Sequence, residues 1–215
     1  MTPSIVDSFA ALPVGTWLEI LAVNEDPARD DLDKQVGTIA LLTGRTEREI
    51  LNLPIQDYRE LAGKAAFLGV PPARLPRAAS SYKAGDFTLI PSVQFDKLTT
   101  AQYIDFQTFL PEGDRRIVEL LSVALVPKGK KYNDGYDIAE VQQAIRADIT
   151  VEQALSLAAF FLTRSAALIK TTRSSLYRWR RQEKDPKKKA ALTQKLEVLE
   201  TLARTLLSAG AGSTK

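Results

Sequence analysis

Apolar residues recur at helical spacing along most of the chain. After Pro27, which can open a helix, the apolar positions keep one face until Gly44 ends the pattern. Thr46 and Glu49 have the spacing of a capping box, in which each residue satisfies an N–H group near the start of the next helix. Together with a short helix around Trp17, these signals predict a first helical unit over residues 1–70.

The pattern changes over residues 71–96. The stretch Gly69–Ser81 is too rich in proline for a helix and predicts a linker. Phe87 and Leu89 then alternate with polar positions directly after Gly85-Asp86, which predicts a short β-hairpin. Because proline cannot donate to a strand ladder, Pro91 places one of these strands at a sheet edge.

Helical signals resume in residues 97–163, a second predicted helical unit. Thr99 can cap its first helix, and an apolar helix is predicted over Asp114–Val126. The sequence "PKGKKYNDGYD" breaks this helix, and Asp137 can cap the next one. A further helix begins at "DITVEQALSL".

That last helix continues into a basic C-terminal arm, residues 164–215. The arm is predicted to be helical to about Lys184, and Pro186 opens a final helix whose leucines are spaced as in a helical hairpin. Between residues 164 and 191 there are ten Lys or Arg residues against Glu183 and Asp185, a net charge of about +8. The rest of the chain then carries 19 basic and 24 acidic residues, about −5, so a mildly acidic body bears a basic arm.

The two helical units resemble each other. At a shift of 86 residues Trp17 aligns with Tyr103 and Ile20 with Phe106, and two later blocks match in the same order. Amphipathic helices can resemble one another by pattern alone, so duplication and coincidence both stay open. We predict a mainly α protein: a helical bundle of two similar halves, with a small β-hairpin insertion and a C-terminal long helical hairpin. Such an architecture favours binding over catalysis.

The amino-acid composition limits the kinds of catalysis and metal binding that the chain can support. The 215 residues, 45% of them hydrophobic, can bury a core, but they include no cysteine and no histidine. Ser-His-Asp and Cys-His catalysis are therefore excluded, and we expect no enzyme, no cofactor and no metal site. "KYNDGYD" lacks the ligand spacing of a calcium loop and predicts a turn instead, and "PKGKK" is not a phosphate loop.

Two groups of residues are candidates for partner binding. Trp17, Tyr103 and Phe106 lie on helical faces, where they are either core residues or exposed anchors for a partner. The second group is the cationic and aromatic side chains of the arm, which suit nucleic acid, an acidic protein partner or only solvent. They are Arg173, Tyr177, Arg178, Trp179, Arg180 and Arg181.

Three phrases carry a resemblance to a known family: "LTTAQYIDF", "VELLSVALVPKGKKYNDGYDIAEV" and "ITVEQALSLAAFFL". They resemble proteins encoded among the tail genes of phages and prophages of Bacteroidetes, which are regarded as tail-assembly chaperones. The resemblance implies a non-enzymatic helper in the host cytoplasm that binds the helical tape-measure protein while the tail tube polymerises. It carries no defined functional residues to this chain.

Two other functions stay open at this stage. The protein could be a structural virion component of the neck or tail end, with the long helical hairpin as its assembly element. It could also bind nucleic acid through the basic arm. A homo-oligomer is possible in each case, and no apolar run is long enough for a membrane span.

Overall fold

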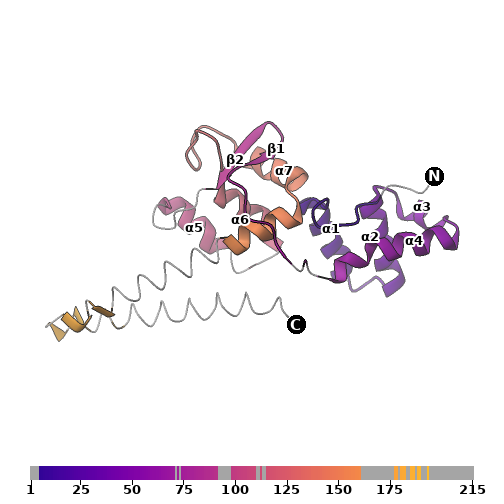
Figure 1. The fold of residues 1–215 in the computed structure, drawn as a ribbon, viewed down its shortest axis with the longest axis horizontal. Helices are drawn as coiled ribbons and strands as arrows, with labels where there is room; N and C mark the ends of the chain where they lie inside the picture. Colours follow the sequence, from indigo (N-terminus) through magenta and orange to yellow (C-terminus); the bar gives the residue numbers. More distant parts are fainter. Residues whose placement is uncertain are drawn as a thin grey trace. The chain divides into compact units, whose positions relative to one another are not determined.

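Helices dominate the computed structural model of the protein, as predicted, and a small antiparallel sheet accompanies them (Figure 1). The contacts divide the chain into two units, Met1–Ser156 and Leu157–Lys215. The structure describes residues 5–70, 72, 74–91, 98–109, 112 and 115–160, together with 177, 178, 180–182, 185, 186, 188, 189 and 193.

The first unit begins with four α-helices and one 3₁₀ turn. They are α1 (Val14–Glu25), α2 (Asp31–Thr43), α3 (Glu47–Leu51), α4 (Ile55–Ala65) and η1 (Ala66–Gly69). Buried residues of α2, α3 and α4 form one apolar cluster, and Tyr58 of α4 donates a hydrogen bond to Gln35 of α2 (2.7 Å).

Local capping chemistry sets the ends of these helices. The capping box of Thr46 and Glu49 is present, and Gly44 ends α2 in the left-handed conformation with φ of 65°, which confirms both predictions. The prediction that Pro27 opens α2 was wrong. The helix begins at Asp31, because the carboxylate of Asp30 accepts a hydrogen bond from the Asp33 N–H and caps the first turn there.

The predicted hairpin is confirmed and belongs to a larger sheet. β1 (Tyr82–Ala84) and β2 (Phe87–Pro91) pair in antiparallel register across the two-residue turn at Gly85 and Asp86. Glycine at the first turn position suits a type II′ turn, and Gly85 has φ of 52°. A third strand, β3 (Leu125–Pro127), pairs with β2, so the sheet order is β1-β2-β3. The prediction that Pro91 places its strand at an edge was wrong, because β2 is the central strand. Pro91 is tolerated at its end, opposite Leu125 of β3 and beyond the last residue that pairs with β1.

Further helices of the first unit lie beside this sheet (Figure 1). They are α5 (Thr100–Phe109), α6 (Ile117–Ala124) and α7 (Ile138–Asp148), and a further helix is described over residues 151–160. The predicted apolar helix was too long at its end. Leu125 and Val126 leave α6 and bury themselves as strand residues opposite Pro91 and Ile90, so tertiary pairing overrides the helical pattern there.

Residues far apart in sequence close the first unit. The Val14 N–H donates to the Ile149 carbonyl and the Val151 N–H donates to the Leu12 carbonyl, each at 2.8 Å. Leu12 and Val151 are buried in the same apolar cluster as Ile20 of α1. The segments predicted as first and second helical units thus share a core. The four-segment division stays a prediction, and the second compact unit begins at Leu157.

Within the described ranges, no helix is both long enough and apolar enough to cross a bilayer. The predicted C-terminal hairpin falls mostly on residues outside those ranges. The described part of the arm agrees with the predicted break: residues 180–182 are helical, Asp185 is not, and Pro186 is helical again. The Lys189 N–H donates to the Asp185 carbonyl (2.9 Å), as in the first turn of a helix.

Close packing of α1 on α7 requires Gly15. A Cβ added at Gly15 would lie 2.7 Å from the carbonyl oxygen of Arg146, whereas a Cβ at the exposed Gly63 of α4 would meet nothing within 4 Å. We predict that Gly15→Ala lowers the free energy of unfolding by about 1–3 kcal/mol through overpacking. Gly63→Ala should raise it by about 0.5–1 kcal/mol through the helix propensity of alanine.

Urea unfolding followed by far-UV circular dichroism measures both variants. The two substitutions add the same methyl group, so a difference in sign isolates the contact with α7. Equal stability of Gly15→Ala and the wild-type protein would contradict the packing described here.

Candidate functional site

Two adjacent side chains of α5 form an exposed apolar surface. Tyr103 is 57% exposed and Ile104 is 56% exposed, although both are large and apolar. Gln102, which directly precedes them, is buried and only 2% exposed. We call Tyr103 and Ile104 the α5 surface.

Gln102 fixes the position of α5. Its side-chain oxygen accepts a hydrogen bond from the Thr99 N–H (3.1 Å), and the Thr99 hydroxyl accepts one from the Gln102 N–H (3.2 Å), so Thr99 caps the helix as predicted. The Gln102 amide also donates to the Val123 carbonyl in α6 (3.1 Å). This buried bond ties the first turn of α5 to the α6–β3 junction.

The loop over residues 128–136, which we call the lysine loop, has a defined backbone. Gly129, Asn133 and Gly135 all take positive φ, and the Lys130 N–H donates to the Pro127 carbonyl (3.0 Å). The prediction of turns at this sequence is therefore confirmed. Asp137 caps α7 directly after the loop by accepting from the Ala139 N–H (2.8 Å), as predicted.

Tyr132 anchors the lysine loop in the core. Its ring is part of an apolar cluster with Val123 and Val126, and the residue is 8% exposed. Its hydroxyl donates to a carboxylate oxygen of Asp105 in α5 (2.7 Å). Burial, followed by this bond to a carboxylate, raises the pKa of the Tyr132 hydroxyl well above its ordinary value.

A cavity of about 360 Å³ opens beside the loop. Its walls come from the ends of β2 and β3, from the first turn of α5 and from the lysine loop. Three exposed lysines are among the residues that line it: Lys128, Lys130 and Lys131. This site was not predicted from the sequence. The pattern "KGKK" shows the lysines but not the strand residues that line the cavity with them.

The other predicted aromatic anchors have partners in the core. Trp17 is half-buried and makes an edge-to-face contact with Phe9, with ring centroids 6.1 Å apart. Phe106 is half-buried and packs on the cluster of Val123, Val126 and Tyr132. Of the three predicted anchors, Tyr103 has the most exposed side chain.

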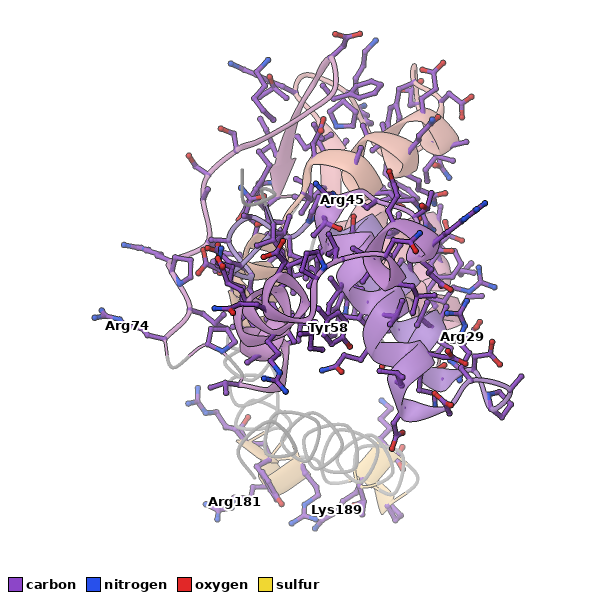
Figure 2. The ribbon with its side chains drawn as sticks, turned by 90° about the vertical axis from the view of Figure 1, so that its right-hand side faces the viewer. Arg29, Arg45, Tyr58, Arg74, Arg181 and Lys189 are labelled. Atoms are coloured by element: carbon purple, nitrogen blue, oxygen red, sulfur yellow. The ribbon has the colours of Figure 1, made fainter. Side chains whose placement is uncertain are left out.

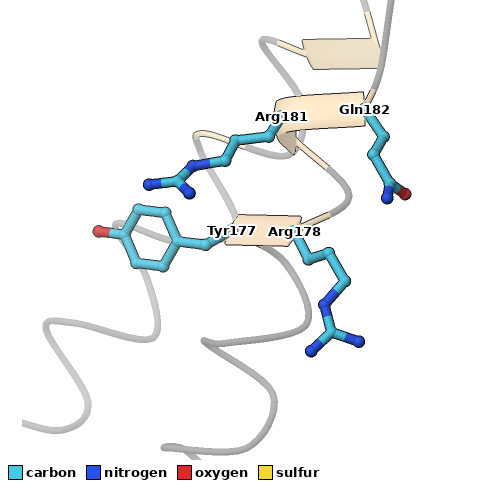
Figure 3. A pocket seen from close by; sticks show the side chains of 4 residues that line it. All are labelled: Tyr177, Arg178, Arg181 and Gln182. Atoms are coloured by element: carbon cyan, nitrogen blue, oxygen red, sulfur yellow. The ribbon is translucent and has the colours of Figure 1, made fainter.

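Four described side chains of the basic arm line a second cavity of about 580 Å³ in the other unit. Figure 3 shows Tyr177 and Arg181 extending on one side of the helix, one turn apart, and Arg178 and Gln182 on the other. The guanidinium carbon of Arg180 lies 5.2 Å from the centre of the Tyr177 ring, a cation–π distance.

Among the described cationic side chains of the arm, Arg180 is half-buried and the others are exposed: Arg178, Arg181, Lys188 and Lys189. Figure 2 shows Arg181 and Lys189 extending away from the ribbon of this unit. Arg173 and Trp179, the other predicted residues of the arm, lie outside the described residues. Among the described residues, no group of three acidic, histidine or cysteine side chains could hold a metal ion.

The bond between Tyr132 and Asp105 provides a test of the anchored loop. We predict that Tyr132→Phe lowers the free energy of unfolding at neutral pH by about 1–2 kcal/mol, because it removes a hydrogen bond to a carboxylate. Tyr103→Phe is the matched control, since this ring is exposed and should leave stability unchanged.

The same bond predicts a dependence on alkaline pH. The unfolded chain loses the Tyr132 proton near the ordinary tyrosine pKa of about 10, whereas the folded protein holds it to higher pH. The stabilisation from this group is therefore complete below about pH 10 and declines as the pH rises further. Urea unfolding at several alkaline pH values should show a shallower decline for Tyr132→Phe; an identical decline would contradict the prediction.

Comparison with known proteins adds no further constraint on the site. No protein-family model, no curated protein and no solved structure matches the chain. Its function has to follow from the α5 surface, the lysine loop, the basic arm and the resemblance carried by the three sequence phrases.

Proposed function

We propose that this protein is a non-enzymatic tail-assembly chaperone that binds a helical tape-measure protein in the host cytoplasm. One observation carries the proposal: two of the three phrases that resemble the chaperone family lie on neighbouring elements around one surface. "LTTAQYIDF" supplies most of α5, and the second phrase supplies most of α6, all of β3, the lysine loop and the first turn of α7.

Side-chain hydrogen bonds join these elements directly. Gln102 of α5 bonds to Val123 of α6, and Asp105 of α5 bonds to Tyr132 of the lysine loop. The Gln142 amide of α7 donates to the Ser122 hydroxyl of α6 (3.1 Å). These hydrogen bonds therefore hold in place the helix that carries the exposed Tyr103 and Ile104.

This surface suits a helical client. An amphipathic helix binds through a few large apolar side chains on one face, and aromatic residues dominate the energy of such contacts. Tyr103 and Ile104 offer an aromatic and an aliphatic contact at consecutive positions of a helix that a buried hydrogen bond ties to α6. In the proposed mechanism, they cover an apolar stripe of the tape-measure protein before tail-tube subunits enclose it.

Removal of the α5 surface should release the client. We predict that Tyr103→Ser combined with Ile104→Ser weakens binding of a co-expressed tape-measure protein by about 2 kcal/mol or more, because it removes the aromatic anchor and its neighbour. Affinity purification followed by quantification of both proteins measures the loss.

Leu51→Ser combined with Ile55→Ser is the matched control. Leu51 and Ile55 are 65% and 66% exposed on α3 and α4, so this variant also removes two exposed apolar side chains. It should retain the client. A tape-measure protein that is equally soluble without this chain would overturn the proposed function, and detection of the chain in purified particles by mass spectrometry would favour a virion component.

Nucleic-acid binding is a second candidate function, supported by the arm. Arg178 and Arg181 line one cavity together with Tyr177, an arrangement that could contact phosphates beside an aromatic ring. If the arm binds DNA, changing Arg178, Arg180 and Arg181 to Gln should abolish binding and reduce its dependence on salt concentration.

Electrophoretic mobility shifts at several salt concentrations measure this effect. The matched control changes Lys34, Lys64 and Lys83 to Gln, which removes the same charge from the first unit. An equal loss of DNA binding in both variants would indicate a response to net charge, and would argue against a specific role of the arm.

A further inference from the structure

The cavity beside the lysine loop combines two kinds of wall. Its apolar lining residues come from the strand ends, Ile90 and Pro91 of β2 with Val126 and Pro127 of β3. The lysine loop adds its three lysines, all exposed. A ligand that fills this space must therefore offer an anionic group next to apolar surface.

The positively charged lysines at this cavity lie close together, and no ion pair among the described residues involves them. Lys128, Lys130 and Lys131 lie within four consecutive residues, and in the part of the chain that the structure describes none of them forms an ion pair. No acidic residue is among the described residues that line the cavity. The nearby carboxylate of Asp105 already accepts the hydrogen bond from Tyr132.

The loop presents these lysines on a fixed backbone. The Lys128 N–H donates to the Thr88 carbonyl of β2 (2.8 Å), and the Asp134 N–H donates to the Lys131 carbonyl (3.0 Å). Tyr132, which follows the last lysine, is buried and bonded to α5. Little backbone entropy would be lost when a ligand binds, so the site is preorganised.

The cavity also adjoins the α5 surface. Thr99 and Gln102 of the first helical turn line it, and Tyr103 lies one turn along the helix from Thr99. The N-terminal end of α5, with its partial positive charge, contributes in the same sense as the lysines. One ligand could therefore contact the α5 surface and the lysines together.

We propose that this cavity binds the acidic side chains of a helical protein segment whose apolar face rests on the α5 surface. The inference rests on the proposed function and names the chemistry of its client: glutamate or aspartate beside a leucine-rich stripe. A protein segment is favoured over nucleic acid because the three lysines lie close together, within residues 128–131. A phosphate backbone calls for cationic groups spread along a track, and the remaining walls here are mainly apolar.

A defined peptide tests the proposal without the natural client. The probe is a fluorescein-labelled amphipathic peptide of leucine and glutamate, compared with its glutamate-to-glutamine counterpart and with single-stranded DNA. Fluorescence anisotropy is measured on the full chain and on the full chain with Arg178, Arg180 and Arg181 changed to Gln. The second protein separates binding at the cavity from binding at the basic arm.

Changing Lys128, Lys130 and Lys131 to Gln should weaken binding of the glutamate peptide about tenfold in both proteins, since three partly exposed ion pairs are lost. The glutamine peptide should bind more weakly than the glutamate peptide to the unchanged loop, and the difference should shrink at high salt. Changing Lys34, Lys64 and Lys83 to Gln removes equal charge elsewhere and should leave binding intact. Circular dichroism checks that each variant is folded.

Equal binding of the two peptides, or an equal loss in the control variant, would overturn the proposal. So would loss of DNA binding in the loop variant with unchanged peptide binding. Purification with the tape-measure protein separates this inference from the proposed function. A client held equally well by the wild-type protein and the loop variant refutes the site alone, whereas a client that neither protein holds refutes the chaperone function.

Discussion

Two backbone hydrogen bonds on either side of Pro13 close the first unit of the chain. They join Leu12 and Val14 to Val151 and Ile149 and place the start of α1 on the end of α7. The contact is tolerated because residue 15 is glycine, where a side chain would strike the Arg146 backbone. In the sequence, the elements α2 to α7 all lie between these two joined segments. The entropy of closing so long a loop has to be offset by the apolar cluster that Leu12 and Val151 share.

Features set by neighbouring residues could be predicted from the sequence. The capping box of Thr46, the cap of α7 by Asp137 and the left-handed Gly44 each depend on residues within a few positions of one another. The hairpin turn at Gly85 is equally local. Even so, a local signal fails where a stronger one lies nearby: Pro27 can open a helix, but the carboxylate of Asp30 provides a better cap.

Features set by distant residues could not be predicted. Leu125 and Val126 continue the apolar pattern of α6, and only their partners in β2 make them a strand. Trp17, Phe106 and Tyr103 lie in similar helical patterns, yet the first two have apolar neighbours from other elements and Tyr103 remains exposed. The same holds for the cavity, whose lysines are adjacent in sequence but whose apolar wall comes partly from β2. Sequence patterns identify which side chains are available, and the fold decides which of them meet.

The sheet is small, and its two outer strands are shorter than the central one. β1 has three residues, with the exposed Lys83 between the buried Tyr82 and Ala84. β3 also has three residues and ends at Pro127, which has no N–H group to donate, just before the charged Lys128. Short strands, lysine and proline at sheet edges all discourage another chain from adding a strand. In the proposed chaperone function, such edges would keep the sheet from templating the aggregation of a client's apolar segments.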